Sequence, residues 1–150
     1  MDTVDARARA PRHPLAPEWL HTPADPNALA DGVWPDSAER GEDGGIRIAG
    51  VPVAELVREH GTPLYVVDEA DARRRAVEMR EVFARELGRI GTGVTVYYAG
   101  KAFLSTEVAR WMRDEGLNLD LSSGGEMAVA LAAGIEPERF GLHGNNKSLR

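Results

Sequence analysis

One segment of the sequence combines the pattern of a buried strand with a single lysine at its end: Val94-Thr95-Val96-Tyr97-Tyr98-Ala99-Gly100-Lys101-Ala102. The alternating β-branched and aromatic residues at its start predict a buried strand. Ser105 follows shortly afterwards and predicts the beginning of a helix. Lys101 therefore lies where a strand gives way to a helix, and in an α/β protein this is the sheet edge at which functional sites form.

The residues around Lys101 favour a chemical role for its amine. The small residues Ala99, Gly100 and Ala102 leave room for a flat ligand against the backbone. An amine that is partly shielded from water loses proton affinity, and it could attack an aldehyde to form an imine. The alternative is a solvated lysine at the end of a strand. That alternative would be preferred for an isolated lysine, but the order of the following elements favours a site.

Composition excludes several classes of protein. The chain has 150 residues, 43% of them hydrophobic, which predicts one packed domain. Its net charge of −6 gives no reason to expect nucleic acid or an anionic membrane as a partner. Cysteine is absent, which is compatible with the reducing cytoplasm. The histidines show no metal-ligand spacing, and no apolar run approaches the ~20 residues that span a bilayer. We expect no metal, no membrane contact and a cytoplasmic location.

The chain before Lys101 divides into three predicted parts. Proline recurs throughout residues 1–45, which predicts an irregular arm. Residues 46–68 predict a strand, a helix and a strand, over 46–48, 51–60 and 64–67. A long helix is expected from Glu69 to about Gly88, and the last part of the chain, 69–150, begins with it. Its apolar residues recur at steps of three and four: Ala76, Met79, Phe83, Leu87 and Ile90.

After Lys101 the pattern repeats at short intervals. A helix from Ser105 is followed by a strand over 117–121, a helix over 123–133 and a strand over 140–143. This alternation predicts βαβ units and a parallel sheet. Lys101, Asp120 and the segment from His143 to Asn146 each follow a strand, so they should lie at the same edge of the sheet. This convergence is the strongest evidence from the residues themselves for a site.

Three parallel strands cannot close a barrel, which needs about eight. We therefore expect the sequence to be the front part of a longer protein and to be inactive alone. The competing interpretation of an inert truncated product predicts an aggregated or partly unfolded chain.

Three motifs occur in order along the chain: Tyr98-Ala99-Gly100-Lys101-Ala102, Leu119-Asp120-Leu121-Ser122-Ser123-Gly124-Gly125-Glu126 and His143-Gly144-Asn145-Asn146-Lys147-Ser148. Together they resemble the pyridoxal-phosphate-dependent ornithine, diaminopimelate and arginine decarboxylases, whose barrel is of the alanine-racemase type. The third motif points to the diaminopimelate branch. The resemblance runs from about Ile46 to Arg150.

The resemblance implies an α/β fold, a (β/α)₈ TIM barrel that binds pyridoxal 5'-phosphate, with the arm and first strands joining a C-terminal β-domain. It implies that Lys101 binds the cofactor as an imine and that Asp120 lies near it. A homodimer and the decarboxylation of meso-2,6-diaminopimelate to L-lysine and CO₂ are also implied. Decarboxylation of another basic amino acid, and a non-catalytic barrel that binds pyridoxal phosphate, are the alternatives.

The other candidate residues have competing structural interpretations. Glu126 completes a capping box with Ser123, so a purely structural role is as good an explanation as a site role. His143 is a candidate cofactor-binding residue or a core histidine with its hydrogen bonds satisfied. Asn145 is the better candidate at the same edge, because an amide beside a strand end can position polar groups.

Overall fold

The computed structural model describes residues 14, 15, 17, 19, 25, 27–30 and 32–144. The chain divides into two compact units, residues 1–34 and 35–150. The described part of the first unit consists of turns and irregular segments, including one closed by a hydrogen bond of 3.1 Å from Ala28 N to Asp25 O. All helices and strands of the described chain belong to the second unit.

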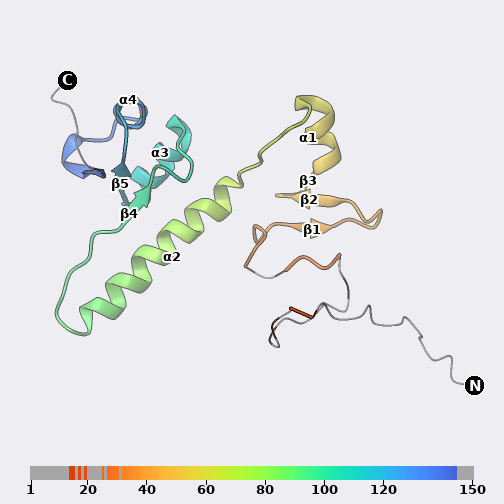
Figure 1. The fold of residues 1–150 in the computed structure, drawn as a ribbon, viewed down its shortest axis with the longest axis horizontal. Helices are drawn as coiled ribbons and strands as arrows, with labels where there is room; N and C mark the ends of the chain where they lie inside the picture. The colour runs from red at the N-terminus through yellow and green to blue at the C-terminus, as the bar shows by residue number, and fades with distance from the viewer. Residues whose placement is uncertain are drawn as a thin grey trace, which may run out of the picture. The chain divides into compact units, whose positions relative to one another are not determined.

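The second unit begins with a small antiparallel sheet. Strands β1 (Glu39–Arg40), β2 (Ile46–Ile48) and β3 (Val51–Pro52) pair in that order, and helix α1 (Val53–His60) follows β3 directly (Figure 1). The strand at 46–48 was predicted. The helix predicted over 51–60 begins at Val53, because Val51 and Pro52 pair with β2 as β3. The predicted arm over 1–45, however, includes β1, because its backbone finds a partner in β2 across the turn at 41–45. Such a two-residue strand has no periodicity of its own to detect.

The strand predicted over 64–67 does not form. These residues pair with no strand in the described part of the chain, and Tyr65 is 93% exposed. Apolar, β-branched composition favours a strand only where another strand offers hydrogen bonds. The segment leads instead into α2 (Glu69–Gly88), the long green helix of Figure 1. Asp68 caps this helix, since its side chain accepts a hydrogen bond of 3.1 Å from Asp71 N.

The predicted parallel sheet is present. Strand β4 (Tyr97–Ala99) pairs with β5 (Asn118–Leu121), and β5 pairs with β6 (Phe140–Leu142), both in parallel. Helix α3 (Thr106–Asp114) connects β4 to β5, and α4 (Gly124–Ala132) with the 3₁₀ turn η1 (Pro137–Arg139) connects β5 to β6. Strand β4 is shorter than the predicted run from residue 94, although Val96 O still accepts a hydrogen bond from Asn118 N.

The core lies between this sheet and its helices. Leu119 and Leu121 of β5 are fully buried, and they pack with residues of α3 and α4 such as Met112 and Ala130. By contrast, only Ala76 of the predicted apolar stripe on α2 is buried. Within the described residues, no helix has both the length and the apolar character required to cross a bilayer.

Candidate active site at the carboxyl edge of the parallel sheet

The turn that carries Lys101 is attached to the central strand of the sheet. Gly100 N donates a hydrogen bond of 2.9 Å to Asp120 O, and Ala102 N donates one of 3.0 Å to Ala99 O. Tyr98 extends the same turn, because its hydroxyl donates a hydrogen bond of 2.6 Å to Phe103 O. The backbone on both sides of Lys101 is therefore fixed. Its side chain is exposed, so in this structure the amine lacks the shielding that the sequence predicted.

Gly100 allows the turn to approach β5 closely. A Cβ atom at this position would lie 3.1 Å from Asp120 O and 3.4 Å from Leu121 Cδ2. The first of these distances is well below ordinary van der Waals contact, so a larger residue would push the turn away from the strand. Gly100 thus has a structural function as well as leaving space near Lys101.

The two faces of the sheet differ in chemistry. Leu119 and Leu121 of β5 point into the core, while Asn118 and Asp120 point to the opposite face. Asp120 is in register with Ala99 of β4 and Gly141 of β6. We call this side of β4–β6 the polar face. Because its neighbours in register are so small, the Asp120 carboxylate is not covered by them.

Asp120 and His143 come together on this face, as predicted. His143 Nδ1 lies 3.5 Å from Asp120 Oδ2, and the two side chains are 61% and 27% exposed. The backbone holds His143 in place, because its N–H donates a hydrogen bond of 2.7 Å to Leu121 O. The strand ends therefore place a carboxylate and an imidazole in contact beside the turn that carries Lys101.

Glu126 has the structural role that its capping-box pattern predicted. Its carboxylate accepts hydrogen bonds from Ser122 N and Ser123 N, and its own N–H donates one of 3.2 Å to the Ser123 hydroxyl. These contacts close the first turn of α4. Asn145, the remaining predicted site residue, lies outside the described residues.

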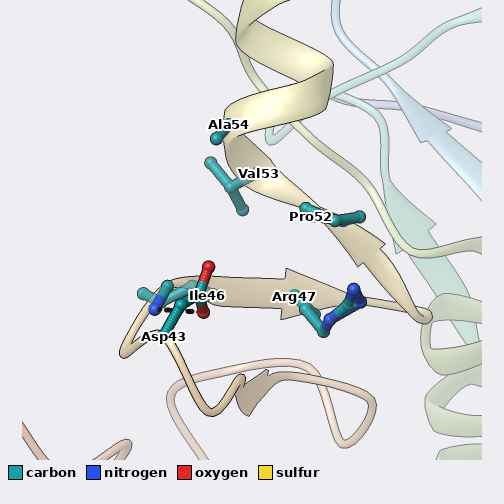
Figure 2. Close-up of a pocket in the computed structure, with 7 residues that line it drawn as sticks. Asp43, Ile46, Arg47, Pro52, Val53 and Ala54 are labelled. Carbon is teal, nitrogen blue, oxygen red and sulfur yellow. Dashed lines mark hydrogen bonds between the residues drawn. The ribbon is translucent and has the colours of Figure 1, made fainter.

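Among the described residues, no group of three or more His, Cys, Asp or Glu side chains is placed to bind an ion. A hollow of about 390 Å³ lies elsewhere in the second unit, lined mainly by apolar residues of β2, β3 and α1 together with Asp43 and Arg47 (Figure 2). It contains none of the predicted site residues, so it is not the candidate active site.

The residues at the edge fit a cofactor with an aldehyde group. Lys101 and Lys147 are the only lysines of the sequence, and Lys101 projects from a fixed backbone with an accessible amine. A primary amine is the group that forms an imine with pyridoxal phosphate. The Asp120 carboxylate, a hydrogen-bond acceptor and a negative charge, lies on the strand to which this turn is attached.

Tyr97 and Gly141 on the polar face were missed from the sequence as site neighbours. A Cβ atom on Gly141 would lie 3.3 Å from the Tyr97 ring and 3.6 Å from Asp120 Oδ1. The period-two alternation of strand side chains, counted back from Lys101 to Tyr97 and from His143 to Gly141, would have placed both residues on this face.

Comparison with known proteins identifies the family. Residues 70–150, more than half of the chain, match the family model for the pyridoxal binding domain of pyridoxal-dependent decarboxylases. The matched range includes Lys101, Asp120 and His143, together with all three strands of the parallel sheet.

Individual relatives agree with this family. The chain is 52% identical over 121 residues to a diaminopimelate decarboxylase of Mycobacterium tuberculosis, covering 81% of this chain and 26% of the relative. It is 48% identical over 142 residues to that of Mycobacterium leprae, covering 95% and 29%. A crystal structure of a diaminopimelate decarboxylase from M. jannaschii matches with a TM-score of 0.64 and 29% identity, over 76% of this chain and 26% of that one. The chain thus spans between a quarter and a third of the length of these relatives.

Proposed function

Because the chain belongs to the pyridoxal-dependent decarboxylases, through their pyridoxal binding domain, we propose that it provides the cofactor-binding lysine of a diaminopimelate decarboxylase. The reaction is the conversion of meso-2,6-diaminopimelate to L-lysine and CO₂. One observation carries the proposal: Lys101 projects from a backbone-fixed turn at the carboxyl edge of the sheet, in a chain about half identical to the mycobacterial enzymes.

In this proposal each residue of the edge has a definite task. Lys101 holds pyridoxal phosphate through its amine and is available to move a proton at the reacting carbon. Pyridoxal phosphate, when bound, supplies the electron sink for the carbanion that loss of CO₂ leaves. Asp120 provides negative charge and a hydrogen-bond acceptor on the polar face. Asn145 is a further proposed cofactor-binding residue, and His143 belongs to the proposed set through its contact with Asp120. The hydrogen bond from Gly100 N to Asp120 O holds the backbone of the Lys101 turn against the backbone of Asp120.

The proposal extends to the architecture and the setting of the enzyme. We propose that residues 69–150 form the first units of a (β/α)₈ barrel, that 46–68 associate with a C-terminal β-domain and that 1–45 form an arm. The parallel order β4-β5-β6 supports the barrel, since a barrel begins with this arrangement. A homodimer and a cytoplasmic location belong to the same proposal, the latter because the reaction produces an amino acid for biosynthesis.

Covalent trapping of the cofactor tests the central residue. The full-length gene product that contains this chain is loaded with pyridoxal phosphate, reduced with borohydride and mapped by mass spectrometry. We expect a pyridoxyl group on the peptide of Lys101. Lys101→Arg should abolish this adduct, and Lys147→Arg, the matched control at the other lysine, should leave it unchanged. An adduct on any other residue, or none, would remove the basis of the proposal.

Substrate assays test the proposed reaction and its substrate. We expect CO₂ release from meso-diaminopimelate, and no comparable release from ornithine or arginine. Preference for ornithine or arginine would replace the proposed substrate while leaving the cofactor assignment intact. An adduct on Lys101 without release from any of the three would instead indicate a non-catalytic protein that binds pyridoxal phosphate.

A further inference from the structure

The contact between Asp120 and His143 connects the end of β6 to the turn that carries Lys101. Asp120 takes part in two separate interactions: its carbonyl oxygen accepts the 2.9 Å hydrogen bond from Gly100 N, and its carboxylate lies 3.5 Å from His143 Nδ1. The backbone of Asp120 is thereby fixed by β4, while the orientation of its side chain depends on β6.

The surroundings of Asp120 leave its carboxylate with little else to hold it. Its register neighbours on the polar face are Ala99 and Gly141, which offer no polar side-chain group. Gly141 has no Cβ atom; at any other residue this atom would lie 3.6 Å from Asp120 Oδ1. Among the described residues, His143 is the one with an ion-pair contact to this carboxylate.

We propose that His143 is a positioning residue, which holds the Asp120 carboxylate on the polar face beside the Lys101 turn. The inference rests on the proposed function, because it assigns the carboxylate a task toward the cofactor on Lys101. His143 acts through Asp120 and need not touch the cofactor. The hydrogen bond from its backbone N–H to Leu121 O fixes the backbone from which the His143 ring reaches the Asp120 carboxylate.

Three substitutions at one position test which nitrogen of the ring matters. His143→Leu removes both nitrogens, His143→Asn retains a donor near the position of Nδ1, and His143→Gln places a donor nearer that of Nε2. The affinity for pyridoxal phosphate is measured by equilibrium dialysis of the full-length gene product, and kcat and KM are measured with meso-diaminopimelate. Thermal unfolding of each variant shows whether it is folded.

We expect His143→Leu to lower the affinity for pyridoxal phosphate about two- to five-fold and to lower kcat by about the same factor. This range corresponds to the loss of a partly exposed ion pair. KM and the unfolding temperature should change little. His143→Asn should restore most of the loss, and His143→Gln should not. His60→Leu is the matched control, because His60 is also exposed and has a carboxylate at a similar distance, 3.8 Å, in Glu59. It should leave all these quantities unchanged.

A double-mutant cycle with Asp120→Asn decides whether the effect passes through Asp120. In that background His143→Leu should have no further effect, because the charge that it positions is gone. Equal effects of His143→Leu with and without Asp120 would overturn the inference, and so would a silent His143→Leu in an enzyme whose unsubstituted form binds the cofactor on Lys101 and releases CO₂. Failure of the unsubstituted protein in those two assays would instead refute the proposed function.

Discussion

Gly100 shows how one residue without a side chain sets the position of its neighbour. The Lys101 turn can lie close to β5 because Gly100 has no Cβ atom. Such an atom would lie 3.1, 3.4 and 3.5 Å from Asp120 O, Leu121 Cδ2 and Leu104 Cδ2. The nearest of these atoms is backbone, which cannot move aside without breaking the pairing of β4 and β5. The requirement for glycine here arises from close approach.

Gly100→Ala is expected to destabilise the protein and to displace Lys101. Overpacking of this kind costs about 1–3 kcal/mol, which urea unfolding of the full-length gene product would measure. Cofactor affinity should fall as well. Gly93→Ala is the matched control, because a Cβ atom there meets nothing within 4 Å. Equal stability of the two variants would contradict the close-approach argument.

Tyr98 also stabilises the turn that carries Lys101. Burial raises the pKa of its phenol, and the hydroxyl donates a hydrogen bond to Phe103 O. Tyr98→Phe should cost about 0.5–1.5 kcal/mol, the usual net contribution of one hydrogen bond.

The raised pKa of Tyr98 gives this contribution a pH dependence. Because folding favours the neutral phenol, the stabilisation is complete below the unfolded pKa of about 10 and is lost as the pH rises through the higher folded value. Urea unfolding of Tyr98→Phe and of the unsubstituted protein at pH 7 and pH 10.5 would measure it. A difference between the two proteins that does not narrow at the higher pH would contradict the assignment.

At the scale of elements, the first turn of α2 is a centre of charge. Burial raises the pKa of Asp71, but hydrogen bonds from Arg74, Arg75 and the backbone N–H of Asp36 outweigh it, so that the pKa lies below its usual value. The three consecutive arginines of α2, at positions 73–75, are therefore engaged in ion pairs. They join the segment before β1 to α2 through an ion pair of 2.6 Å between Arg74 and Asp36.

Asp71→Asn should destabilise the protein at neutral pH by about 0.5–1 kcal/mol, since its arginine partners are partly exposed. A carboxylate with a lowered pKa contributes stability above its unfolded pKa of about 3.9, and this contribution is lost as the pH falls through the folded value. The difference between variant and unsubstituted protein should thus shrink between pH 7 and pH 3 in urea unfolding.

Glu78→Gln serves as a control for this experiment, because the Glu78 side chain is 64% exposed and its one ion pair within the described part of the chain is with Arg74. It should change stability little at either pH. A loss of stability in Asp71→Asn that is as large at pH 3 as at pH 7 would show that the charge of Asp71 is not responsible.

At the scale of the whole molecule, the described chain exposes apolar surface along α2. Met79, Phe83 and Ile90 of its predicted stripe are 50%, 48% and 74% exposed. Among the described strands, β4 and β6 also form the two edges of the parallel sheet, each with one side unpaired. Exposed apolar side chains and unpaired strand edges both promote association.

The 150-residue chain, expressed by itself, is therefore expected to self-associate at micromolar concentration, as judged by light scattering after gel filtration. Phe83→Ser should reduce the association because it removes apolar surface. Ala84→Ser, the neighbouring position on the same helix, should not. A monodisperse monomer with a sharp cooperative melt would show that these surfaces do not drive association.

Much of the fold could be predicted because it depends on local patterns. The helix over 69–88 and the capping box of Ser123 and Glu126 form from residues a few positions apart, and both were predicted. The parallel sheet followed from the alternation of strands and helices. The segment 64–67 has equally strong strand composition and was predicted wrongly, because strand pairing depends on a partner distant in sequence.

The candidate site was likewise predictable in part from the sequence and decided in part by the tertiary structure. Sequence alone determined that a lysine follows one strand, that Asp120 and His143 lie at the ends of the next two, and that their motifs resemble one family. The order of elements along the chain is enough to place these residues at one edge, because parallel strands bring their carboxyl ends together. Only the tertiary structure decided that Gly100 bonds to the backbone of Asp120, that His143 Nδ1 meets the Asp120 carboxylate, and that most of the α2 stripe is exposed. These depend on register and packing between distant segments, which local periodicity does not encode.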